Sequence, residues 1–179
     1  MANFDDAIPF TLQAEGGYNN DPADPGGETY CGITKTADPE WQGWVIVDEH
    51  KPLHSEQIIN DAALHASVVA FYKTKYWNAI SGDNINDQNV AAFFFDWSVT
   101  SGKAIKKVQA LVGVNADGTV GPQTIAAINN YNGNLLDDMK NARVNYYKSL
   151  VVNNSALNKF LQGWLNRIDN FFTAHGLQT

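Results

Sequence analysis

The sequence has one cysteine, few basic residues and no long apolar run, and each shortage excludes a class of protein. Cys31 is the only cysteine in 179 residues, so no intramolecular disulfide can form. Twelve Lys and Arg stand against nineteen Asp and Glu, whereas a nucleic-acid-binding protein normally carries a basic surface. The longest apolar run, residues 90–95, is far shorter than the roughly 20 residues that span a bilayer. We therefore expect no nucleic-acid partner and no stable membrane insertion.

The first residues also lack a targeting signal. Residues 1–6 contain neither the basic nor the apolar region of a secretory signal peptide, which predicts a protein made in the cytoplasm. If its target lies outside, a holin or a dedicated export system must release it. Apolar residues make up 44% of the chain and aromatic residues 12%, which is enough for a packed interior. We expect a monomer.

What the sequence does have is helical periodicity. Apolar residues recur at helical spacing in four segments, at about residues 56–77, 88–100, 135–152 and 156–174. Shorter helices are expected over 103–112 and from Pro122, which suits a first helical position. Near the N-terminus a helix should end at Glu15, with a kink or a start at Pro9. Residues 44–47 give the only plausible strand. The pattern predicts a mainly α fold with a loop-rich segment at residues 16–34.

Residues 15–34 contain the groups best suited to chemistry. Glu15 stands at a predicted helix end, and Asp24 follows nine residues later on a loop that Pro22 and Pro25 stiffen. Cleavage of a glycosidic bond needs a protonated acid and a second carboxylate that activates water or attacks. Glu15 is the better acid, because the negative end of a helix disfavours a further negative charge. Asp24, on a polar loop, should stay ionised.

The same residues also allow plainer interpretations. Glu-Gly-Gly can be an ordinary helix end, and Asp-Pro-x-Asp-Pro-Gly-Gly an ordinary turn. Asp21, Asp24 and Glu28 could bind calcium, but they lack the alternate-residue spacing of an EF-hand loop. The four histidines show no zinc-ligand spacing and are expected at the surface, at His50, His54, His65 and His175. We expect no metal and no other cofactor.

The run Glu15-Gly-Gly-Tyr-x-Asn-Asp-Pro-x-Asp-Pro-Gly-Gly-x-Thr-x-x-Gly-Ile-Thr34 resembles the N-acetylmuramidases of glycoside hydrolase family 108. These enzymes occur in phage endolysins and prophage-like loci, and some carry the label of secretion activator. The resemblance implies a lysozyme-like fold, bacteriolytic hydrolysis of the β-1,4 bond between N-acetylmuramic acid and N-acetylglucosamine, and Glu15 as the essential acid. A looser similarity to phage-type lysozymes implies that Asp24 and Thr29 complete the catalytic group. Such an enzyme acts on the cell wall or in the periplasm after its release.

The second half resembles the same family. The segments at 95–102, 108–113, 117–124 and 163–167 are similar to its Phe-Asp-x-x-x-x-Ser-Gly stretch, its predicted peptidoglycan-binding region and its Gly-Trp-x-x-Arg ending. The resemblance implies a catalytic region over 4–82 and a helical peptidoglycan-binding region over 83–174, packed as one compact unit. From the residues alone, this second region can instead complete the cleft wall and core without binding wall fragments by itself.

The glycan strand of peptidoglycan is the expected partner, and seven side chains are candidates to contact it: Tyr18, Asn20, Asp21, Tyr30, Thr34, Asp96 and Trp97. Asp96 is either a surface group or a buried, paired one, and Trp97 either stacks on a sugar or belongs to the core. Trp77 and Trp164 are assigned to the core and Cys31 to a buried, inert thiol. Two other functions stay open: a non-catalytic peptidoglycan-binding or secretion-accessory protein, and a lytic transglycosylase.

Overall fold

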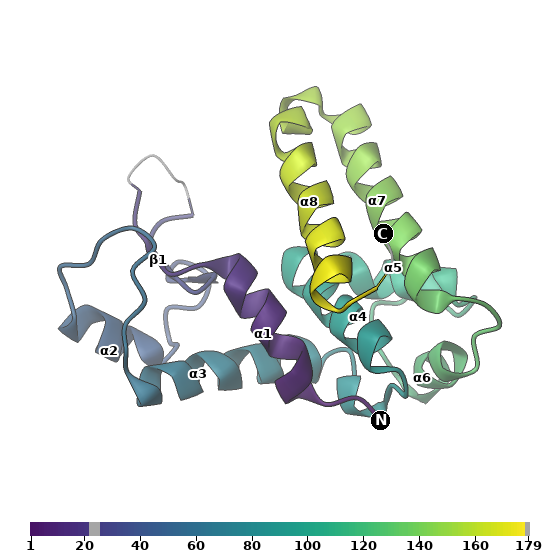
Figure 1. Ribbon diagram of the computed structural model, residues 1–179, viewed down its shortest axis with the longest axis horizontal. Helices are drawn as coiled ribbons and strands as arrows, with labels where there is room; N and C mark the ends of the chain where they lie inside the picture. Colours follow the sequence, from purple (N-terminus) through teal and green to yellow (C-terminus); the bar gives the residue numbers. More distant parts are fainter. Residues whose placement is uncertain (22–25, 178–179) are drawn as a thin grey trace. The chain divides into compact units, whose positions relative to one another are not determined.

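The structure is a computed structural model that describes residues 1–21 and 26–177 (Figure 1). It is mainly helical, and the expected mainly α, lysozyme-like fold is confirmed. The elements in chain order are α1 (Phe4–Glu15), β1 (Tyr18–Asn19), β2 (Thr29–Tyr30), β3 (Ile33–Thr34), α2 (Gly43–Glu49), α3 (Ala62–Tyr72), a π-helical turn η1 (Lys73–Trp77), a 3₁₀ turn η2 (Gly82–Asn84), α4 (Gln88–Thr100), α5 (Ala104–Leu111), α6 (Pro122–Asn129), α7 (Leu135–Asn153), a 3₁₀ turn η3 (Ser155–Leu157) and α8 (Asn158–Ala174). Within the described residues, no helix is long and apolar enough to cross a membrane.

The longer helices agree with the periodicity, and the exceptions have local causes. The prediction of a strand over residues 44–47 is wrong, because they belong to α2, where Trp44 and Val47 are buried on one helical face. The helix predicted from residue 56 begins only at Ala62, where the Asp61 carboxylate caps it by accepting from the Leu64 N–H at 2.7 Å. A start at Pro9 is also wrong, since α1 begins at Phe4 and includes this proline.

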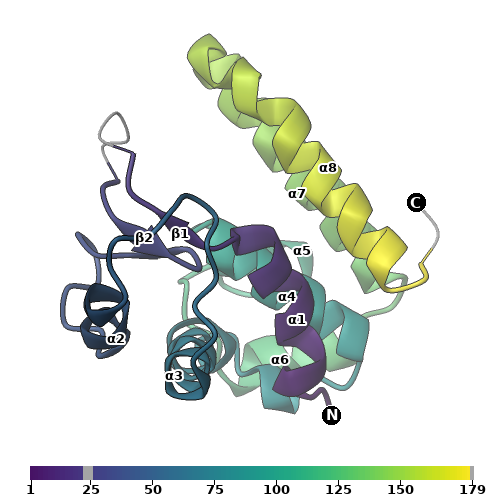
Figure 2. The same cartoon turned by 60° about the vertical axis from the view of Figure 1, so that its left-hand side comes forward.

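The chain divides into two compact units. The first, here called the sheet unit, comprises residues 11–75 and contains the three short strands with α2 and α3. The second, the helical unit, comprises residues 1–10 and the chain from residue 76 onward, with α4 to α8. α1 begins in the helical unit and ends in the sheet unit. In Figure 2, β1 and β2 can be followed beside α2, while α7 and α8 form a long antiparallel hairpin.

The core of the helical unit is built around α4. Every residue from Val90 to Trp97 is buried, so this helix is enclosed on nearly all sides. The Phe95 ring lies 5.6 Å from the Phe4 ring and 5.8 Å from the Trp77 ring, and the Phe93 ring lies 5.0 Å from that of Phe171. Full burial of each such side chain stabilises the fold by roughly 1.5–3 kcal/mol. This packing explains how one helix can carry three consecutive phenylalanines, because other elements cover nearly all of its sides.

A buried ion cluster joins three helices of this unit. Asp96 on α4 accepts hydrogen bonds from Arg143 Nη1 on α7 at 2.9 Å and from Arg167 Nη2 on α8 at 2.7 Å. Asp96 and Arg143 have no exposed side-chain surface. Burial alone would raise the pKa of Asp96, but the charges of the two arginines lower it below its usual value. The cluster therefore holds an ionised carboxylate where α4, α7 and α8 meet.

Removing this carboxylate should strongly destabilise the protein. Asp96→Ala leaves two arginines facing a dry interior without their anion, and we expect a loss of about 3–5 kcal/mol in urea unfolding. The matched control is Asp169→Ala, which removes the 4.0 Å pair between Lys140 and a carboxylate with 59% exposure. That variant should lose less than about 1 kcal/mol. Equal losses in the two variants would contradict the role assigned to Asp96.

The same cluster predicts how stability depends on pH. Because the folded-state pKa of Asp96 is lowered, its stabilisation is complete above the unfolded-state pKa of about 3.9 and is lost as the pH falls through the folded-state pKa. The difference in unfolding free energy between the wild type and Asp96→Asn should be constant from pH 7 to about pH 5 and shrink below pH 4. Urea titrations of both proteins at each pH measure it, and a difference that grows on acidification would refute the assignment.

Candidate active site

The end of α1 is fixed by two glycines. Gly16 has a φ of +73°, the left-handed conformation that commonly ends a helix immediately after its last residue, here Glu15. The Gly17 N–H donates to Glu56 Oε2 at 3.3 Å. A Cβ on Gly17 would lie only 2.5 Å from the Glu56 carbonyl oxygen and 2.7 Å from that of Gln57, so no side chain fits there. The backbone after Glu15 is therefore clamped against residues 56–57.

The Glu15 carboxyl group lies against the turn between β2 and β3. A Cβ on Gly32 would lie 2.6 Å from Glu15 Oε2 and 2.7 Å from the Tyr72 hydroxyl oxygen. The Tyr72 hydroxyl donates to the Cys31 carbonyl at 2.7 Å, which holds this turn to the end of α3. Glu15 is half-buried, and its Oε1 atom is shielded from solvent. The structure thus places the Glu15 carboxyl group at the turn between β2 and β3, partly shielded from solvent.

The neighbouring thiol is inert. The pKa of Cys31 is raised to about 11, chiefly by burial; a hydrogen bond with Tyr30 opposes this rise, and the charge of Glu15 adds to it. The thiolate is the nucleophilic form of cysteine, so Cys31 stays protonated and unreactive at neutral pH. The side chain is half-buried rather than fully buried, and the prediction of an inert thiol is otherwise supported.

The three strands form one antiparallel sheet in the order β1-β2-β3, and its register sorts the candidate residues into two rows. Tyr18 pairs with Tyr30, and Tyr30 with Ile33, and all three side chains are buried. On the opposite face, Thr29 lies between its partners Asn19 and Thr34, all partly exposed. The partly exposed face thus presents a polar row of one amide and two hydroxyl groups, which suits hydrogen bonds to sugar hydroxyls.

The side chains of Tyr18 and Tyr30 lie on the buried face of the sheet. The Tyr18 hydroxyl donates to Glu28 Oε1 at 3.0 Å, and the Tyr30 hydroxyl accepts from the Ile59 N–H at 3.1 Å. Their exposed fractions are only 6% and 2%. The residue that sequence reasoning missed is Asn19. The sequence carries no signal for it, because a strand of two residues is too short to show alternation.

Asn20 and Asp21 are exposed at the end of β1. Together with Tyr18 and Asn19 they line a cavity of about 390 Å³, whose other wall is formed by Leu53 and Ser55. The segment at 53–57 could not be assigned to the site from sequence, since it lies more than 30 residues from β1. Asp24 lies outside the described residues, so its proposed catalytic role stays a prediction.

A cluster of charged side chains, which was not predicted from the sequence, stabilises the sheet unit. Lys35 Nζ lies 3.0 Å from Glu28 Oε2 and 2.9 Å from Asp48 Oδ1, and Lys51 pairs with the same two carboxylates. Partial burial alone would raise the pKa of Glu28, but hydrogen bonds from Lys51 and Lys35 lower it below its usual value. Glu28 is therefore ionised at neutral pH.

The structure corrects the placement of Asp96 and Trp97 as substrate contacts. Both belong to the helical unit and have 0% exposure, because Asp96 serves the ion cluster and Trp97 lies in the core. Trp77 is buried as predicted, whereas Trp164 is half-buried between the rings of Tyr147 and Phe160. In residues 1–21 and 26–177, no group of His, Cys, Asp or Glu could hold a metal ion.

A mainly α fold with a half-buried carboxyl group at the turn of a small sheet is compatible with a glycoside hydrolase. Residues 8–102 match the family described as glycosyl hydrolase 108, and residues 103–169 match the one described as a predicted peptidoglycan domain. The chain belongs to glycosyl hydrolase family 108 and is a peptidoglycan hydrolase. It is similar to SagA from Brucella abortus, with 27% identity, a TM-score of 0.69, and coverage of 96% of this chain and 92% of that one. A comparison with curated proteins finds no match.

The contact between Glu15 and Gly32 predicts a selective loss of activity. Gly32→Ala puts a methyl group where the Glu15 carboxyl and Tyr72 hydroxyl groups lie, and a displacement of about 1 Å costs on the order of 100-fold in rate. The matched control is Gly27→Ala. It has nearly the same φ, +72° against +74°, but its Cβ would meet only Thr36 Cγ2 at 3.4 Å.

Both variants should lose stability in thermal melting because both force alanine into the left-handed region, and Gly32→Ala should lose more because its methyl group also displaces Glu15 and Tyr72. Only Gly32→Ala should lose most of its peptidoglycan-hydrolysing activity, measured as release of soluble fragments. An equal loss of activity in both variants would show that backbone strain causes the loss, and not the displacement of the Glu15 carboxyl group.

Proposed function

We propose that the protein is an N-acetylmuramidase that cleaves the β-1,4 bond between N-acetylmuramic acid and N-acetylglucosamine, with Glu15 as its general acid. The proposal rests on the position of the Glu15 carboxyl group. This group lies at the end of α1, against Gly32 and beside the Tyr72 hydroxyl group. A leaving glycosidic oxygen requires a proton, which a carboxyl group can donate.

In the proposed reaction, the proton of Glu15 passes to the glycosidic oxygen as the bond to the anomeric carbon breaks. A water molecule then adds to that carbon and gives up a proton to a base. Thr29 is partly exposed on the open face of the sheet and is suited to orient this water by hydrogen bonding. Asp24 is the proposed base. Carboxyl groups about 6.5–9.5 Å apart would give inversion, and about 5–5.5 Å retention.

The polar row of Asn19, Thr29 and Thr34 is the proposed sugar-contacting face. The cavity beside it adds Asn20 and Asp21, together with the apolar side chain of Leu53 and the hydroxyl of Ser55. Amide and hydroxyl groups can both donate and accept, which matches the hydroxyl and N-acetyl groups of the glycan. Since the chain carries a net charge of −7, recognition at this face rests on such contacts rather than on charge attraction.

A lytic transglycosylase is the second candidate. It also needs one acid, but the muramyl hydroxyl replaces water, so no second carboxylate is required. A purely binding protein would have no need for a carboxyl group held in this way. We further propose that the enzyme reaches the cell wall or periplasm after release by a holin or an export system.

Glu15→Gln tests the proposal. The amide keeps the size of the side chain but cannot donate the proton that the leaving group needs, so we expect hydrolysis to fall by at least about 100-fold with little change in melting temperature. Glu56→Gln is the control, because its amide oxygen can still accept from the Gly17 N–H and should preserve most of the activity.

Mass spectrometry of the wild-type digest separates the alternatives. Reducing N-acetylmuramic acid ends identify hydrolysis at the proposed bond, and reducing N-acetylglucosamine ends would place the cut at the other bond. Anhydro-muramic ends would establish a transglycosylase. Absence of fragments would leave only binding, and a fully active Glu15→Gln would remove Glu15 from the mechanism.

A further inference from the structure

The helical unit contains a cavity of about 500 Å³ at the start of α4, the end of α6 and the start of α7. Its buried lining residues are all apolar: Ile85, Val90, Ile128, Leu135 and Leu136. A volume of this size can hold a small ligand or a few side chains of a partner. The cavity has no part in the site built on Glu15, which belongs to the sheet unit.

The exposed rim of this cavity is acidic. Asp87 is one of the lining residues and is exposed. Two further carboxylates are bonded to lining residues: Asp137 Oδ2 accepts from the Asn134 amide at 2.6 Å. Asp138 Oδ2 accepts from the Tyr131 hydroxyl at 2.8 Å. Three carboxylates exceed the partial positive charges, about half a unit each, of the helix N-termini at α4 and α7.

The segments that form this cavity contain no basic residue. Residues 76–102 and 112–139 supply every described lining residue except Leu177, and neither segment contains Lys, Arg or His. Lys140, the next basic residue along the chain, lies 4.0 Å from Asp169 on α8. We call this depression the acidic cavity. Its charge and its apolar lining favour an occupant that is both cationic and apolar.

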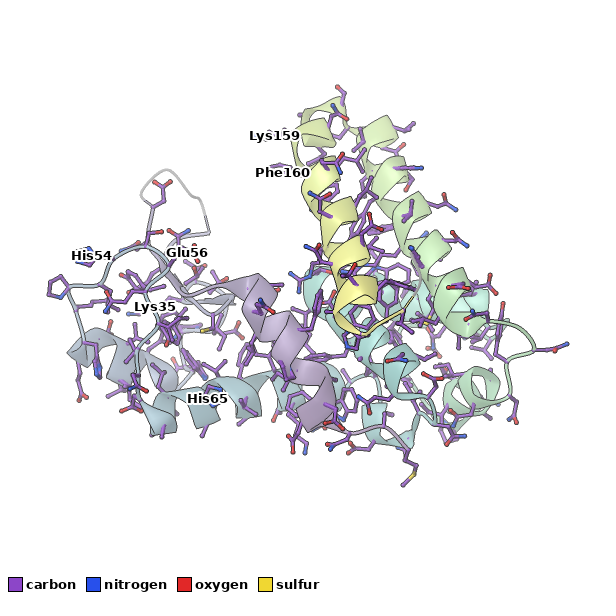
Figure 3. All side chains as sticks on the ribbon, viewed as in Figure 1. Lys35, His54, Glu56, His65, Lys159 and Phe160 are labelled. Atoms are coloured by element: carbon purple, nitrogen blue, oxygen red, sulfur yellow. The ribbon has the colours of Figure 1, made fainter. Side chains whose placement is uncertain are left out.

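The end of the hairpin of α7 and α8 has the opposite charge. Residues 139–168 contain five basic residues and no Asp or Glu. Among these, Lys148 and Lys159 are exposed, and in the described part of the chain neither forms an ion pair. Val152 has 85% exposure and Phe160 has 46%, and Figure 3 shows Lys159 and Phe160 at one end of α8. We call Lys148, Val152, Lys159 and Phe160 the hairpin tip.

We propose that the hairpin tip of one molecule binds in the acidic cavity of a second copy of this chain. Lys148 and Lys159 pair with the carboxylates of the rim, and the exposed part of the Phe160 ring covers the apolar lining. The Phe160 ring stacks on Trp164 with centroids 6.0 Å apart, so it loses little side-chain freedom on binding. The chain itself thus supplies the cationic and apolar occupant that the acidic cavity fits.

Side-chain amides on both surfaces can complete this contact. Asn86 and Asn89 line the acidic cavity, and among the described residues their side chains form no hydrogen bond. Asn153 and Asn158 are exposed beside the hairpin tip. An amide both donates and accepts, so these groups can pair with one another or with backbone groups of the second copy.

The hairpin tip cannot reach the acidic cavity of its own molecule. The cavity includes Leu135, the first residue of the 19-residue helix α7, whereas Lys148 lies near the other end of that helix. About 20 Å of helix separates them. The contact is therefore heterologous, and each pair retains one unused tip and one unused cavity, so assembly grows head to tail. Because the tip is small beside a standard interface of about 1,600 Å², association is weak, and the monomer expected from the sequence is the dilute form.

Sedimentation velocity of the purified protein tests the proposal between about 10 μM and about 1 mM, the range suited to a weak interface. The sedimentation coefficient of the wild type should rise with concentration, and rise less in about 1 M salt, where charges are screened beyond about 3 Å. The tip variant is Lys148→Gln with Lys159→Gln and Phe160→Ser, and the cavity variant is Asp137→Asn with Asp138→Asn. Each should associate about fivefold or more weakly, because two exposed ion pairs are lost. Circular dichroism and thermal melting establish that each variant is folded.

A mixture of the two variants gives the sharper result. The cavity variant keeps an intact hairpin tip, and the tip variant keeps an intact acidic cavity. An equimolar mixture should therefore form dimers that neither variant forms alone. Longer assemblies should not form, because each of these dimers has used its only intact tip and its only intact cavity.

Two further variants match these changes in net charge at exposed positions elsewhere. Lys103→Gln with Lys106→Gln and Ile58→Ser is the control for the tip variant, and Ile58 has 62% exposure. Glu40→Gln with Glu49→Gln is the control for the cavity variant. Both controls should associate as the wild type does.

Four outcomes would overturn the proposal. These are a wild type that stays monomeric up to about 1 mM, folded variants that associate as the wild type does, a mixture that forms no dimer, and controls that associate as weakly as the variants they match. Hydrolysis enters none of these measurements. The proposal therefore stands or falls separately from the proposed function.

Discussion

The two-residue turn between β2 and β3 is the constraint on which the candidate site depends. Cys31 and Gly32 both have positive φ, at 46° and 74°, as a tight hairpin turn with right-handed strand twist requires. Their conformation fixes the pairing of Tyr30 with Ile33 and of Thr29 with Thr34. A slip of one residue would exchange the two faces and bury the polar row. The register of the sheet and the exposure of its hydroxyl groups therefore share one cause.

The same turn also holds the Glu15 carboxyl group in place. The Cys31 N–H donates to the Gly17 carbonyl at 3.1 Å, and the Cys31 carbonyl accepts from Tyr72 at 2.7 Å. Gly32 has no side chain, so the Glu15 carboxyl group can approach its backbone. One turn thus links the end of α1, the sheet and the end of α3. A positive-φ cysteine is costly for a residue with a Cβ, and the hydrogen bonds on both of its sides hold it there.

The extent to which the sequence predicts this arrangement depends on the length of each pattern. α4, α7 and α8 repeat their apolar positions over several turns, so their limits agree with the structure to within about two residues. Each strand has two residues, too short for any alternation to show, and the row of Asn19, Thr29 and Thr34 follows only from the register. Glu56 and Tyr72 reach the site across about 40 residues of chain, and no local pattern indicates such contacts.

Asp96 shows a second limit of prediction from the sequence. Its neighbours in the sequence are apolar, and the position alone allows either a surface or a paired carboxylate. The choice is decided by Arg143 and Arg167, 47 and 71 residues away, which supply the charge that keeps it ionised in the core. Resemblance to the family favours the buried, paired alternative, and the 0% exposure of Asp96 confirms it.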